Sequence, residues 1–495
     1  MFRKILTGSA MALLAGSAFA ATDAPSGYTK CVQLGSTCAM SGTHQAAIGK
    51  SGVFAYATFT GSFACTLANF PGAPSNSSWC SYDPAASSAS SSAASSVAAS
   101  SVSSSKSSSS SSSVVSSSSS SVAASSVASS KSSSANASSV PSTSSRPQLS
   151  STSAANNTIA KYLGSWDPTA GVGNVSSFTA KYTVAADGTG THKTVQAAIS
   201  AAVSNGGSSR IYIAVKAGTY REVVCVPAAA PPITLYSTTA DASKTVIVYN
   251  NANPKPKSSG TAANPCSPNA SATTYGTGGS TTFSAFSQGF QAKNLTFSND
   301  YVEDTYSSSN QSAVALTAQG DQQLYENVRV LGNQDSLLTN TSAVGTVAHH
   351  YFKSSYVEGD TDFIFGRGTA VFDGCEIRYL TTRKSNGVIL APSTAASNSY
   401  GILIINSTLT QSGSASNSVS LGRAWDESVG SLSNYVNGTS PNGQAVIRDS
   451  ALGGHIVKTA PWGASTVSRP FCSSNCTNSA NRFYEYNNSG SGNGG

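Results

Sequence analysis

Two aspartates in successive repeats of this chain could do chemistry as a pair. Asp335 follows Val328 by seven residues, and Asp362 follows Ser355 by seven. If each repeat forms one coil of a β-solenoid, the two carboxyl groups stack one coil apart, at about the 4.7–4.9 Å spacing of paired strands. Carboxylates that close do not ionise independently, so one keeps its proton to higher pH. The pair could therefore divide the roles of nucleophile and general acid.

Short β-rich segments must position this pair, and Ile211–Val215, Val246–Tyr249 and Gly401–Ile405 are typical examples. Pairs of residues at i and i+2 recur among them, and alternate residues of a strand share one face. The pairs, at intervals of 33, 27, 20, 32 and 43 residues, are Leu295/Phe297, Val328/Val330, Ser355/Val357, Cys375/Ile377, Ser407/Leu409 and Ser450/Leu452. Variable spacing around a constant unit is typical of a β-helix with loops. We therefore expect an all-β solenoid domain over residues 158–495.

One amphipathic helix is predicted ahead of these repeats. Val195, Ala198, Ile199 and Ala202 fall at i, i+3, i+4 and i+7, and Asn205-Gly206-Gly207 ends the pattern. We expect this helix to cover the open end of the coil stack, because an uncovered strand edge invites pairing with other chains.

The N-terminal part of the chain contains an export signal and a linker by composition. Residues 1–20 are typical of a secretory signal, in which Arg3 and Lys4 precede an apolar run that ends at Ala18-Phe19-Ala20. That run is too short for a membrane-spanning helix. Residues 84–157 are mostly Ser with Ala and Val, which bury too little apolar surface to fold, so we expect a flexible linker. We therefore expect an exported, extracellular monomer without a membrane anchor.

Residues 21–83 form a candidate accessory module that is small, β-rich and stapled by disulfides. Its four cysteines are Cys31, Cys38, Cys65 and Cys80. An oxidising destination favours two disulfides among them, and all three connectivities stay open. The aromatic residues Tyr56, Phe59 and Trp79 either bind plant cell-wall polysaccharide or form the module's core, and we favour the core.

The charge of the chain is modest. The formal net charge of +7 becomes +5 once Arg3 and Lys4 leave with the signal. A mildly positive protein suits a polyanionic substrate outside the cell, although an ordinary soluble surface has the same balance. We expect no nucleic-acid partner, because the sequence has no basic cluster.

Several motifs of the C-terminal domain occur in one order. They are Asp187–Gly190, Gly218–Glu222, Ala292–Phe297, Gly332–Leu337, Asp362–Gly366 and Leu421–Trp425. Together they resemble the pectin methylesterases (pectinesterases) over the whole domain. The resemblance implies a right-handed parallel β-helix, and an esterase that removes methyl groups from methyl-esterified pectin (homogalacturonan) and releases methanol.

The resemblance also implies a role for each catalytic residue. Asp362 attacks the methyl-ester carbonyl and forms a covalent acyl-enzyme. Asp335 gives its proton to the departing methanol and then acts as base for the hydrolytic water. Gln334 stabilises the oxyanion, and Arg423 holds Asp362 ionised and aimed. No metal or other cofactor is implied.

The substrate contacts follow the family only in part. Phe365 and Trp425 offer apolar faces to the sugar ring. The family's second oxyanion glutamine opens a QAVAL motif, where this chain has Ser312 and places Gln311 one residue early. A one-residue shift turns a side chain to the other face of a strand, so Gln311 takes part only if a bulge turns it back, and Ser312 is the alternative. Leu338 stands where the family often has Tyr, which changes one substrate contact.

The five cysteines of the large domain are an odd number, so at least one is free. Cys375 matches a family cysteine that bridges to the neighbouring coil, but the partner position here is Ser355. The resemblance thus implies that Cys375 is a free, buried thiol. It leaves Cys225–Cys266 and Cys472–Cys476 as the disulfides.

Other residues and functions are alternatives. Asp360 shares a strand face with Asp362 and is the rival nucleophile, although the match to the DFIFG motif favours Asp362. His349-His350 could bind a metal or act as a base, but no third ligand is suitably spaced, and we interpret the pair as part of a turn or loop. A pectate lyase or polygalacturonase shares the β-helix, and an inactive β-helix could only bind polysaccharide. Retention of both aspartates and Arg423 argues for activity.

Overall fold

The computed structural model describes residues 24–25, 28–50, 53–70, 73, 79–83, 145–169, 173–472 and 481–494. The predicted signal and nearly all of the predicted Ser-rich linker lie outside these residues. The chain divides into two compact units, one within residues 1–130 and one within 131–495. In the part of the chain that is described, no helix is both long and apolar enough to cross a membrane.

The N-terminal unit is small and β-rich, as expected, and the structure shows that its strands pair antiparallel. Its described strands pair in the order β1-β6-β3-β4, with β2 and β5 pairing separately. Their bounds are β1 (Thr29–Gln33), β2 (Thr37–Cys38), β3 (Thr43–Lys50), β4 (Val53–Thr60), β5 (Phe63–Ala64) and β6 (Trp79–Tyr82), with the 3-10 turn η1 (Leu67–Asn69) after β5. The disulfides are Cys31–Cys38 and Cys65–Cys80, which selects one of the three connectivities left open by the sequence.

The aromatic residues of this unit divide between core and surface. Phe59 packs in the core and stacks on Phe63 with ring centroids 4.3 Å apart, as predicted. Trp79 is half-buried beneath the ammonium of Lys30, which lies 5.5 Å from the ring centroid. The core prediction is wrong for Tyr56, which is 48 % exposed, because its strand β4 turns that side chain outward.

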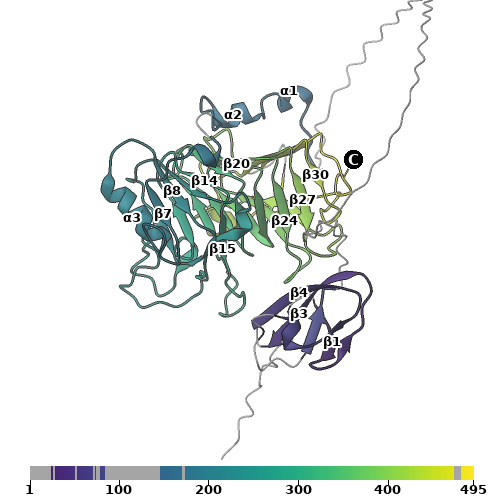
Figure 1. The fold of residues 1–495 in the computed structure, drawn as a ribbon. Coiled ribbons are helices and arrows are strands. Elements are labelled where there is room, and N and C mark those ends of the chain that lie inside the picture. The colour runs from purple at the N-terminus through teal and green to yellow at the C-terminus, as the bar shows by residue number, and fades with distance from the viewer. Residues whose placement is uncertain are drawn as a thin grey trace, which may run out of the picture. The chain divides into compact units, whose positions relative to one another are not determined.

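The C-terminal unit is a parallel β-helix with three long sheets (Figure 1). In each sheet the described strands are parallel neighbours from successive coils. The first of these sheets contains β10 (Val224–Val226), β13 (Phe283–Ala285), β16 (Leu316–Ala318), β19 (Leu337–Thr339), β22 (Thr361–Gly366), β25 (Val388–Pro392), β28 (Ser420–Arg423) and β31 (Trp462–Gly463).

The other two sheets complete the walls of the solenoid. The longer contains β7 (Tyr182–Val184), β8 (Ile211–Val215), β11 (Ile233–Ser237), β14 (Gln291–Lys293), β17 (Gln323–Glu326), β20 (His349–Lys353), β23 (Thr369–Asp373), β26 (Ile402–Ile405), β29 (Gln444–Arg448) and β32 (Arg482–Tyr486). The third contains β9 (Gly218–Arg221), β12 (Thr245–Tyr249), β15 (Thr296–Asn299), β18 (Arg329–Leu331), β21 (Tyr356–Gly359), β24 (Glu376–Tyr379), β27 (Thr408–Gln411) and β30 (Ala451–Leu452).

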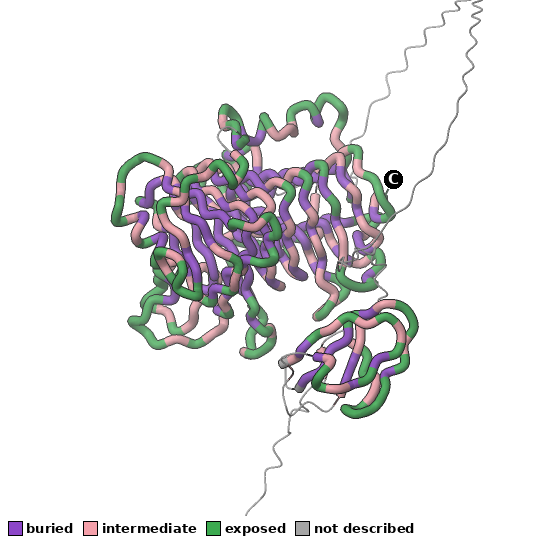
Figure 2. The backbone as a smooth tube through the Cα atoms, in the orientation of Figure 1, coloured by how far each residue is buried: buried purple, intermediate pink, exposed green. Residues whose placement is uncertain are grey.

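The predicted inward pairs do face the interior. All twelve of their residues are buried, and their strands pair in register through β15, β18, β21, β24, β27 and β30. On the adjoining sheet, Tyr325, Phe352 and Phe372 stack coil upon coil with centroids 4.6 and 4.7 Å apart. Figure 2 shows this buried interior running along the solenoid. Burying each such ring stabilises the fold by roughly 1.5–3 kcal/mol, so the stack fixes the register of the coils.

A left-handed backbone residue precedes each inward pair and makes the corner of the coil. Five of these residues are not glycine: Asn294, Asn327, Ser354, Asn406 and Asp449, with φ between 47° and 59°. Asn and Asp tolerate this region better than other side-chain-bearing residues. The corners also bond to one another, because Asn327 Nδ2 donates to Asn294 Oδ1 at 2.8 Å.

The described helices are short, apart from one. Their bounds are α1 (Ser151–Ala154), α2 (Ile159–Leu163), α3 (Val195–Asn205) and α4 (Gly276–Gly279), with 3-10 turns η2 (Val175–Ser177), η3 (Ala242–Lys244) and η4 (Leu432–Asn434). Helix α3 is the predicted one. It buries Val195, Ala198, Ile199 and Ala202 against the end strands β7, β8 and β10, so it covers that end of the stack.

Residues 145–157, which we assigned to the linker, lie against the β-helix instead. The guanidinium of Arg146 makes two hydrogen bonds to the carboxylate of Glu485 at 2.9 and 2.8 Å, and both side chains are buried. Gln148 pairs with Glu485 as an isolated bridge. The linker prediction extends too far here because this segment gains its partners from the far end of the chain, which composition cannot reveal.

The cysteines of the large unit follow the prediction where they are described. Cys225 and Cys266 form a disulfide, and Cys375 is free and buried. Cys472 is also disulfide-bonded, but its expected partner Cys476 lies outside the described residues.

The interpretation of His349 and His350 as a turn or loop pair is wrong, because both lie in strand β20. His349 bonds through its backbone and ring to Asp321, and the buried ring of His350 reaches the carbonyl of Gly320 at 3.1 Å.

Candidate active site

The two aspartates lie in register on adjacent coils. Asp335 occupies the turn before β19, and Asp362 is the second residue of β22. An isolated parallel bridge joins Gln334 to Thr361, and Leu337 pairs with Ile364, so Asp335 is opposite Asp362. The equal offset seen in the sequence therefore corresponds to an equal position in the two coils.

Both aspartates have strained backbones. The φ angles are 62° at Asp335 and 49° at Asp362, in the left-handed region. The pairing of β22 with β25 also shifts register between Thr361 and Ile364, which is a β-bulge. Such strain costs roughly 1–3 kcal/mol per residue and is concentrated at functional sites. Here it interrupts the alternation of the strand where the two carboxyl groups reach a common cavity.

Arg423 of β28 forms a bidentate ion pair with Asp362. Its Nε lies 3.0 Å from Oδ1, and its second terminal nitrogen lies 2.6 Å from Oδ2. The Asp362 side chain is 10 % exposed. Burial alone would lower the pKa of Arg423, but the hydrogen bonds and charge of Asp362 outweigh burial and raise it. The pair therefore favours Asp362 as an oriented carboxylate.

Asp335 lies in the opposite electrostatic environment. Burial raises the pKa of its carboxyl group well above the ordinary value, and the charge of Asp362 raises the pKa further. The hydrogen bond of Ser312 and the charge of Arg423 lower this pKa but do not prevail. Asp335 is thus the member of the pair that keeps a proton to higher pH, as the sequence predicted.

Both carboxyl groups face a cavity of about 170 Å³. Its lining contains Gln334, Ser312, Phe365 and Trp425, all of which the sequence singled out. The rings of Phe365 and Trp425 lie 5.6 Å apart and form one apolar wall with Ala391. A polar floor with an acidic pair and an aromatic wall suits a sugar carrying a reactive carbonyl group.

The side chain of Gln311 does not reach this cavity. Its Oε1 accepts from the hydroxyl of Tyr301 at 2.8 Å, and its Nε2 donates to the carbonyls of Tyr306 and Ser308 at 2.9 and 2.7 Å. No bulge turns it back. The proposal that it supplies the second oxyanion donor is therefore wrong, and its amide holds the 301–308 loop instead.

Gln334 is held by hydrogen bonds at its side chain and at its backbone. Its Oε1 accepts the backbone N–H of Gln311 at 3.3 Å, so its Nε2 must point the other way, toward Asn310 and the cavity. Its own N–H donates to Glu303 Oε1 at 3.1 Å. Gln311 thus contributes to the site through its backbone and not through its side chain.

A second acidic pair lies behind Gln334. Asp360 is 1 % exposed, and both of its oxygens accept from Arg383, at 2.8 and 3.0 Å. Glu303 contacts the same guanidinium. Burial, followed by the charge of Asp360, raises the pKa of Glu303 to about 7 despite Arg383. Asp360 is spent on this ion pair and does not line the cavity, which supports Asp362 over its rival.

Comparison with known proteins identifies the family. The profile of the Pectinesterase family matches residues 181–435, just over half of the chain. The chain belongs to the pectinesterase family. A pectinesterase from Ralstonia nicotianae is 56 % identical over 363 residues, covering 70 % of this chain and 91 % of that protein. A pectinesterase from Sitophilus oryzae is 37 % identical over 368 residues, covering 70 % and 93 %. The chain is therefore an ester hydrolase of this family.

Solved structures of family members agree. The rice weevil pectin methyl esterase has a TM-score of 0.62 and 36 % identity, and covers 71 % of this chain and 98 % of its own. Escherichia coli YbhC has a TM-score of 0.59 and 30 % identity, covering 71 % and 96 %. The right-handed parallel β-helix expected for this pectinesterase-family chain is thereby confirmed.

Four residues of the cavity lining were missed by the sequence reading: Thr277, Asn310, Ala391 and Thr466. Asn310 had a usable signal, since an Asn two residues before a Ser often turns back on that residue's N–H. Thr277 arrives on the short helix α4 and Thr466 on a loop, and the position of both segments depends on long-range contacts. Leu338 is 7 % exposed and packs with Phe365, so the residue that replaces the family's Tyr lies behind the wall of the cavity.

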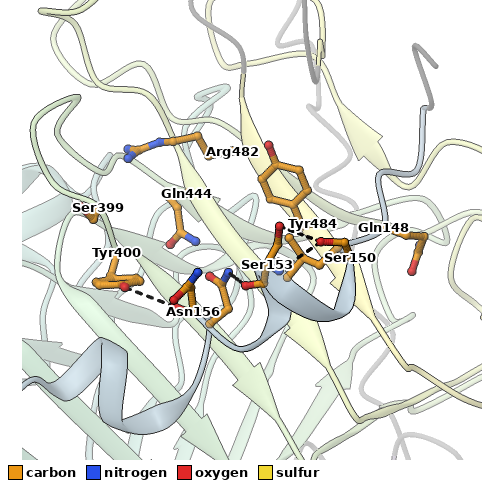
Figure 3. A pocket seen from close by; sticks show the side chains of 11 residues that line it. Gln148, Ser150, Ser153, Asn156, Ser399, Tyr400, Gln444, Arg482 and Tyr484 are labelled. Carbon is orange, nitrogen blue, oxygen red and sulfur yellow. Dashed lines mark hydrogen bonds between the residues drawn. The ribbon is translucent and has the colours of Figure 1, made fainter. Parts of the chain in front are cut away.

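A larger cleft of about 560 Å³ lies elsewhere, beside β29 and β32 and the α1 segment (Figure 3). No carboxylate lines it. Arg482 donates to the carbonyls of Asn442, Asn398 and Ala395, and Gln444 Nε2 donates to the Tyr162 hydroxyl at 2.7 Å. Its strongest polar groups are thus spent on the fold, so the smaller cavity is the candidate active site.

Proposed function

We propose that this chain hydrolyses the methyl esters of galacturonate units in pectin by a covalent mechanism on Asp362. The observation that carries the proposal is the difference between two adjacent carboxyl groups that share one cavity. Asp362 is held by a bidentate arginine, whereas burial and the charge of its neighbour raise the pKa of Asp335. One cavity therefore holds a nucleophile and an acid at the same pH.

In the first half of the reaction, an Asp362 oxygen attacks the ester carbonyl carbon, and the electron pair of the carbonyl bond moves to oxygen. Collapse of this tetrahedral intermediate breaks the bond to the methoxy group. That group takes the proton of Asp335 and leaves as methanol. The product on the enzyme is a mixed anhydride between galacturonate and Asp362, and Asp335 is now a carboxylate.

In the second half, Asp335 removes a proton from water, and the resulting hydroxide adds to the acyl carbon. Collapse breaks the bond to Asp362, which leaves as a carboxylate and returns to Arg423. The free galacturonate carboxyl group departs and Asp335 is protonated again. The sum is ester plus water to acid plus methanol, and it needs no metal step.

Gln334, Phe365 and Trp425 would act on the substrate without changing covalently. The Nε2 of Gln334 is aimed into the cavity, where it can donate to the developing oxyanion. The aromatic wall would pack against the apolar face of the sugar ring. Arg423 remains 33 % exposed, so its charge can also attract the polyanionic chain.

The test is methanol release from highly methylated pectin, with the length of the polymer followed in the same samples. The proposal requires methanol to appear without chain shortening. A lyase or polygalacturonase would shorten the polymer, and an inactive binding protein would release nothing. Either result would overturn the proposed reaction.

We further propose that the protein acts outside the cell as a monomer, with its N-terminal unit binding cell-wall polysaccharide. Tyr56 supports this role, since it is 48 % exposed and lies edge-on to Tyr28 with centroids 6.0 Å apart. The full chain should sediment with insoluble plant cell wall, and Tyr56→Ala should reduce that fraction while activity on soluble pectin stays unchanged. Equal sedimentation of both proteins would show that Tyr56 does not bind the polysaccharide. The molar mass from light scattering tests whether the protein is a monomer.

A further inference from the structure

Of the two glutamines considered as oxyanion donors, Gln334 and Gln311, only one can act in the proposed mechanism. Gln334 faces the cavity, but the side chain of Gln311 is turned away and fully bonded to the 301–308 loop. A tetrahedral oxyanion accepts more than one hydrogen bond, and each donor aimed at it contributes strongly to the rate. The question is which other group of this chain fills the place.

Asn310 lies beside Gln334 with its amide in a fixed orientation. Its Oδ1 accepts from the backbone N–H of Ser312 at 3.0 Å and also from the Ser312 hydroxyl. A backbone N–H can only donate, so the atom facing Ser312 must be oxygen and the Nδ2 must point away from it. Asn310 lines the cavity with Gln334 and both aspartates. Among the described residues, no acceptor takes a hydrogen bond from its Nδ2.

Asn310 and Gln334 are built alike. In each, the amide oxygen accepts a backbone N–H from the 311–312 segment, and the amide nitrogen is left for the cavity. Nε2 of Gln334 also donates to Oδ1 of Asn310 at 3.5 Å, which sets the two amides side by side and leaves Gln334 one further N–H group. A side chain that has given its acceptor to the backbone and still has an N–H group without an acceptor is arranged to donate to an anion.

We propose that the Nδ2 of Asn310 is the second oxyanion donor, in place of the displaced glutamine. This rests on the proposed esterase function and adds a catalytic residue to it. The arrangement compensates for the one-residue shift of Gln311, because the turn that directs the Gln311 side chain away from the cavity places Asn310 in its lining. The ligand it would recognise is the carbonyl oxygen of a galacturonate methyl ester as it becomes negative.

Two other side chains at the cavity could donate instead. The hydroxyl of Ser312 contacts both Asn310 Oδ1 and the carboxyl group of Asp335, and it has a single hydrogen to give. That hydrogen is committed to one of these two groups, so Ser312 has none left for an oxyanion. Thr277 accepts from Asn253 Nδ2 at 3.0 Å, and its own hydroxyl hydrogen is uncommitted among the described residues. Thr277 is thus the stronger rival and must be included in the test.

The test compares two variants of Asn310 that separate donation from loop geometry. Asn310→Ala removes both the donor and the acceptor. Asn310→Asp keeps an oxygen acceptor for Ser312 but replaces the donating nitrogen by oxygen. We expect kcat for methanol release to fall about 10²-fold in both, with KM changing much less, because loss of one oxyanion donor acts on the transition state. Thr277→Val should retain kcat within about fivefold of the unaltered enzyme.

The remaining results overturn the inference. If Asn310→Asp is as active as the unaltered enzyme, the residue only shapes the loop. If Asn310→Asp is impaired and Asn310→Ala is not, the added charge is the cause and no donor was lost. A change confined to KM, or a large loss in Thr277→Val with Asn310→Ala unchanged, places the donor elsewhere. Matching thermal unfolding midpoints ensure that every variant compared is folded.

Failure of this inference is distinguishable from failure of the proposed function. If the unaltered full-length protein releases no methanol from methylated pectin, the esterase mechanism falls. If it releases methanol, and Asn310→Ala releases it at an equal rate, only the assignment of Asn310 falls. The same assay on the same preparations separates the two results.

Discussion

The two clefts of the β-helix unit differ in a way that size does not predict. The cleft beside β29 and β32 has about 560 Å³, and the cavity at Asp335 and Asp362 has about 170 Å³. In the larger one, Arg482 and Gln444 give their hydrogen bonds to backbone carbonyls and to Tyr162. In the smaller one, amide nitrogens and a carboxyl group whose pKa is raised by burial line the open space.

The comparison teaches that polar groups without a full set of partners, held by the β-helix, distinguish the candidate active site from the other cleft. Each such group carries a cost in stability, because the fold must bury it without a full set of partners. Strained φ angles at both aspartates and a raised pKa at Asp335 are part of that cost. Variants that each remove one of these groups therefore test whether methanol release depends on them.

The largest effect is expected from Asp362→Ala. Without the nucleophile no acyl-enzyme forms, so methanol release should fall by about 10⁴-fold or more. Arg423 loses its partner in this variant, and Asp362→Asn serves as the matched control because it keeps the size of the side chain. Methanol release near the unaltered rate in either variant would show that the small cavity is not the reactive one.

Asp335→Asn should have the next largest effect on rate, about 10²–10⁴-fold, because the leaving group loses its acid. It should also stabilise the protein. The folded-state pKa of Asp335 is raised, so the unaltered protein loses stability as pH rises above the unfolded value of about 3.9 toward the folded pKa.

Thermal unfolding at pH 4 and pH 8 checks this second part. The midpoints of the variant and the unaltered protein should be closer together at pH 4 than at pH 8, where the variant should be higher. A midpoint difference that does not change with pH would mean that burial does not raise the pKa of Asp335. The electrostatic part of the difference between the two clefts would then be wrong.

Much of this architecture follows from local patterns. Phe297, Val330 and Ile377 mark the inward face because period-two burial is a property of each strand by itself. The register of Asp335 with Asp362 follows because consecutive coils repeat the same offset. The left-handed corners at Asn294 and Asn327 fall on a residue type that tolerates positive φ, so residue type alone could have indicated them.

The parts that could not be predicted depend on where distant segments meet. The direction of Gln311 was left open, and it is decided by Tyr301 and the 301–308 loop, whose path no periodicity fixes. Arg146 looks like part of a polar linker until Glu485, 339 residues later, is beside it. Thr277 reaches the cavity on the short helix α4, which is far from both aspartates in sequence. Local chemistry predicted the strands and the reactive pair, and tertiary contacts decided the rim of the cavity.

Glu303→Gln tests the support behind Gln334, and its effect should be smaller. The pKa of Glu303 is raised to about 7 by burial and then by Asp360. The stability of the unaltered protein should therefore decline as pH rises from about 4.3, the unfolded value, through about 7, while the neutral glutamine does not titrate. Unfolding midpoints at pH 5 and pH 8 should differ by about 2 °C less in the variant. Equal differences in both proteins would contradict the raised pKa.

The smallest effect is expected from Tyr484→Ala, which alters the larger cleft. Tyr484 is half-buried and lines that cleft, so its loss should lower the unfolding midpoint slightly. Methanol release from pectin should stay within about twofold, because no group needed for the reaction has been removed. Tyr400→Phe is the matched control, since Tyr400 lines the same cleft and this change removes only the hydrogen bond of its hydroxyl to the backbone of Asn156 at 3.2 Å, while the ring stays. A tenfold loss on polymeric pectin in Tyr484→Ala, with a short methyl ester unaffected, would show that the larger cleft binds the polymer. The distinction between a cleft whose polar groups bond to the fold and a cleft whose polar groups are available to substrate would then be wrong.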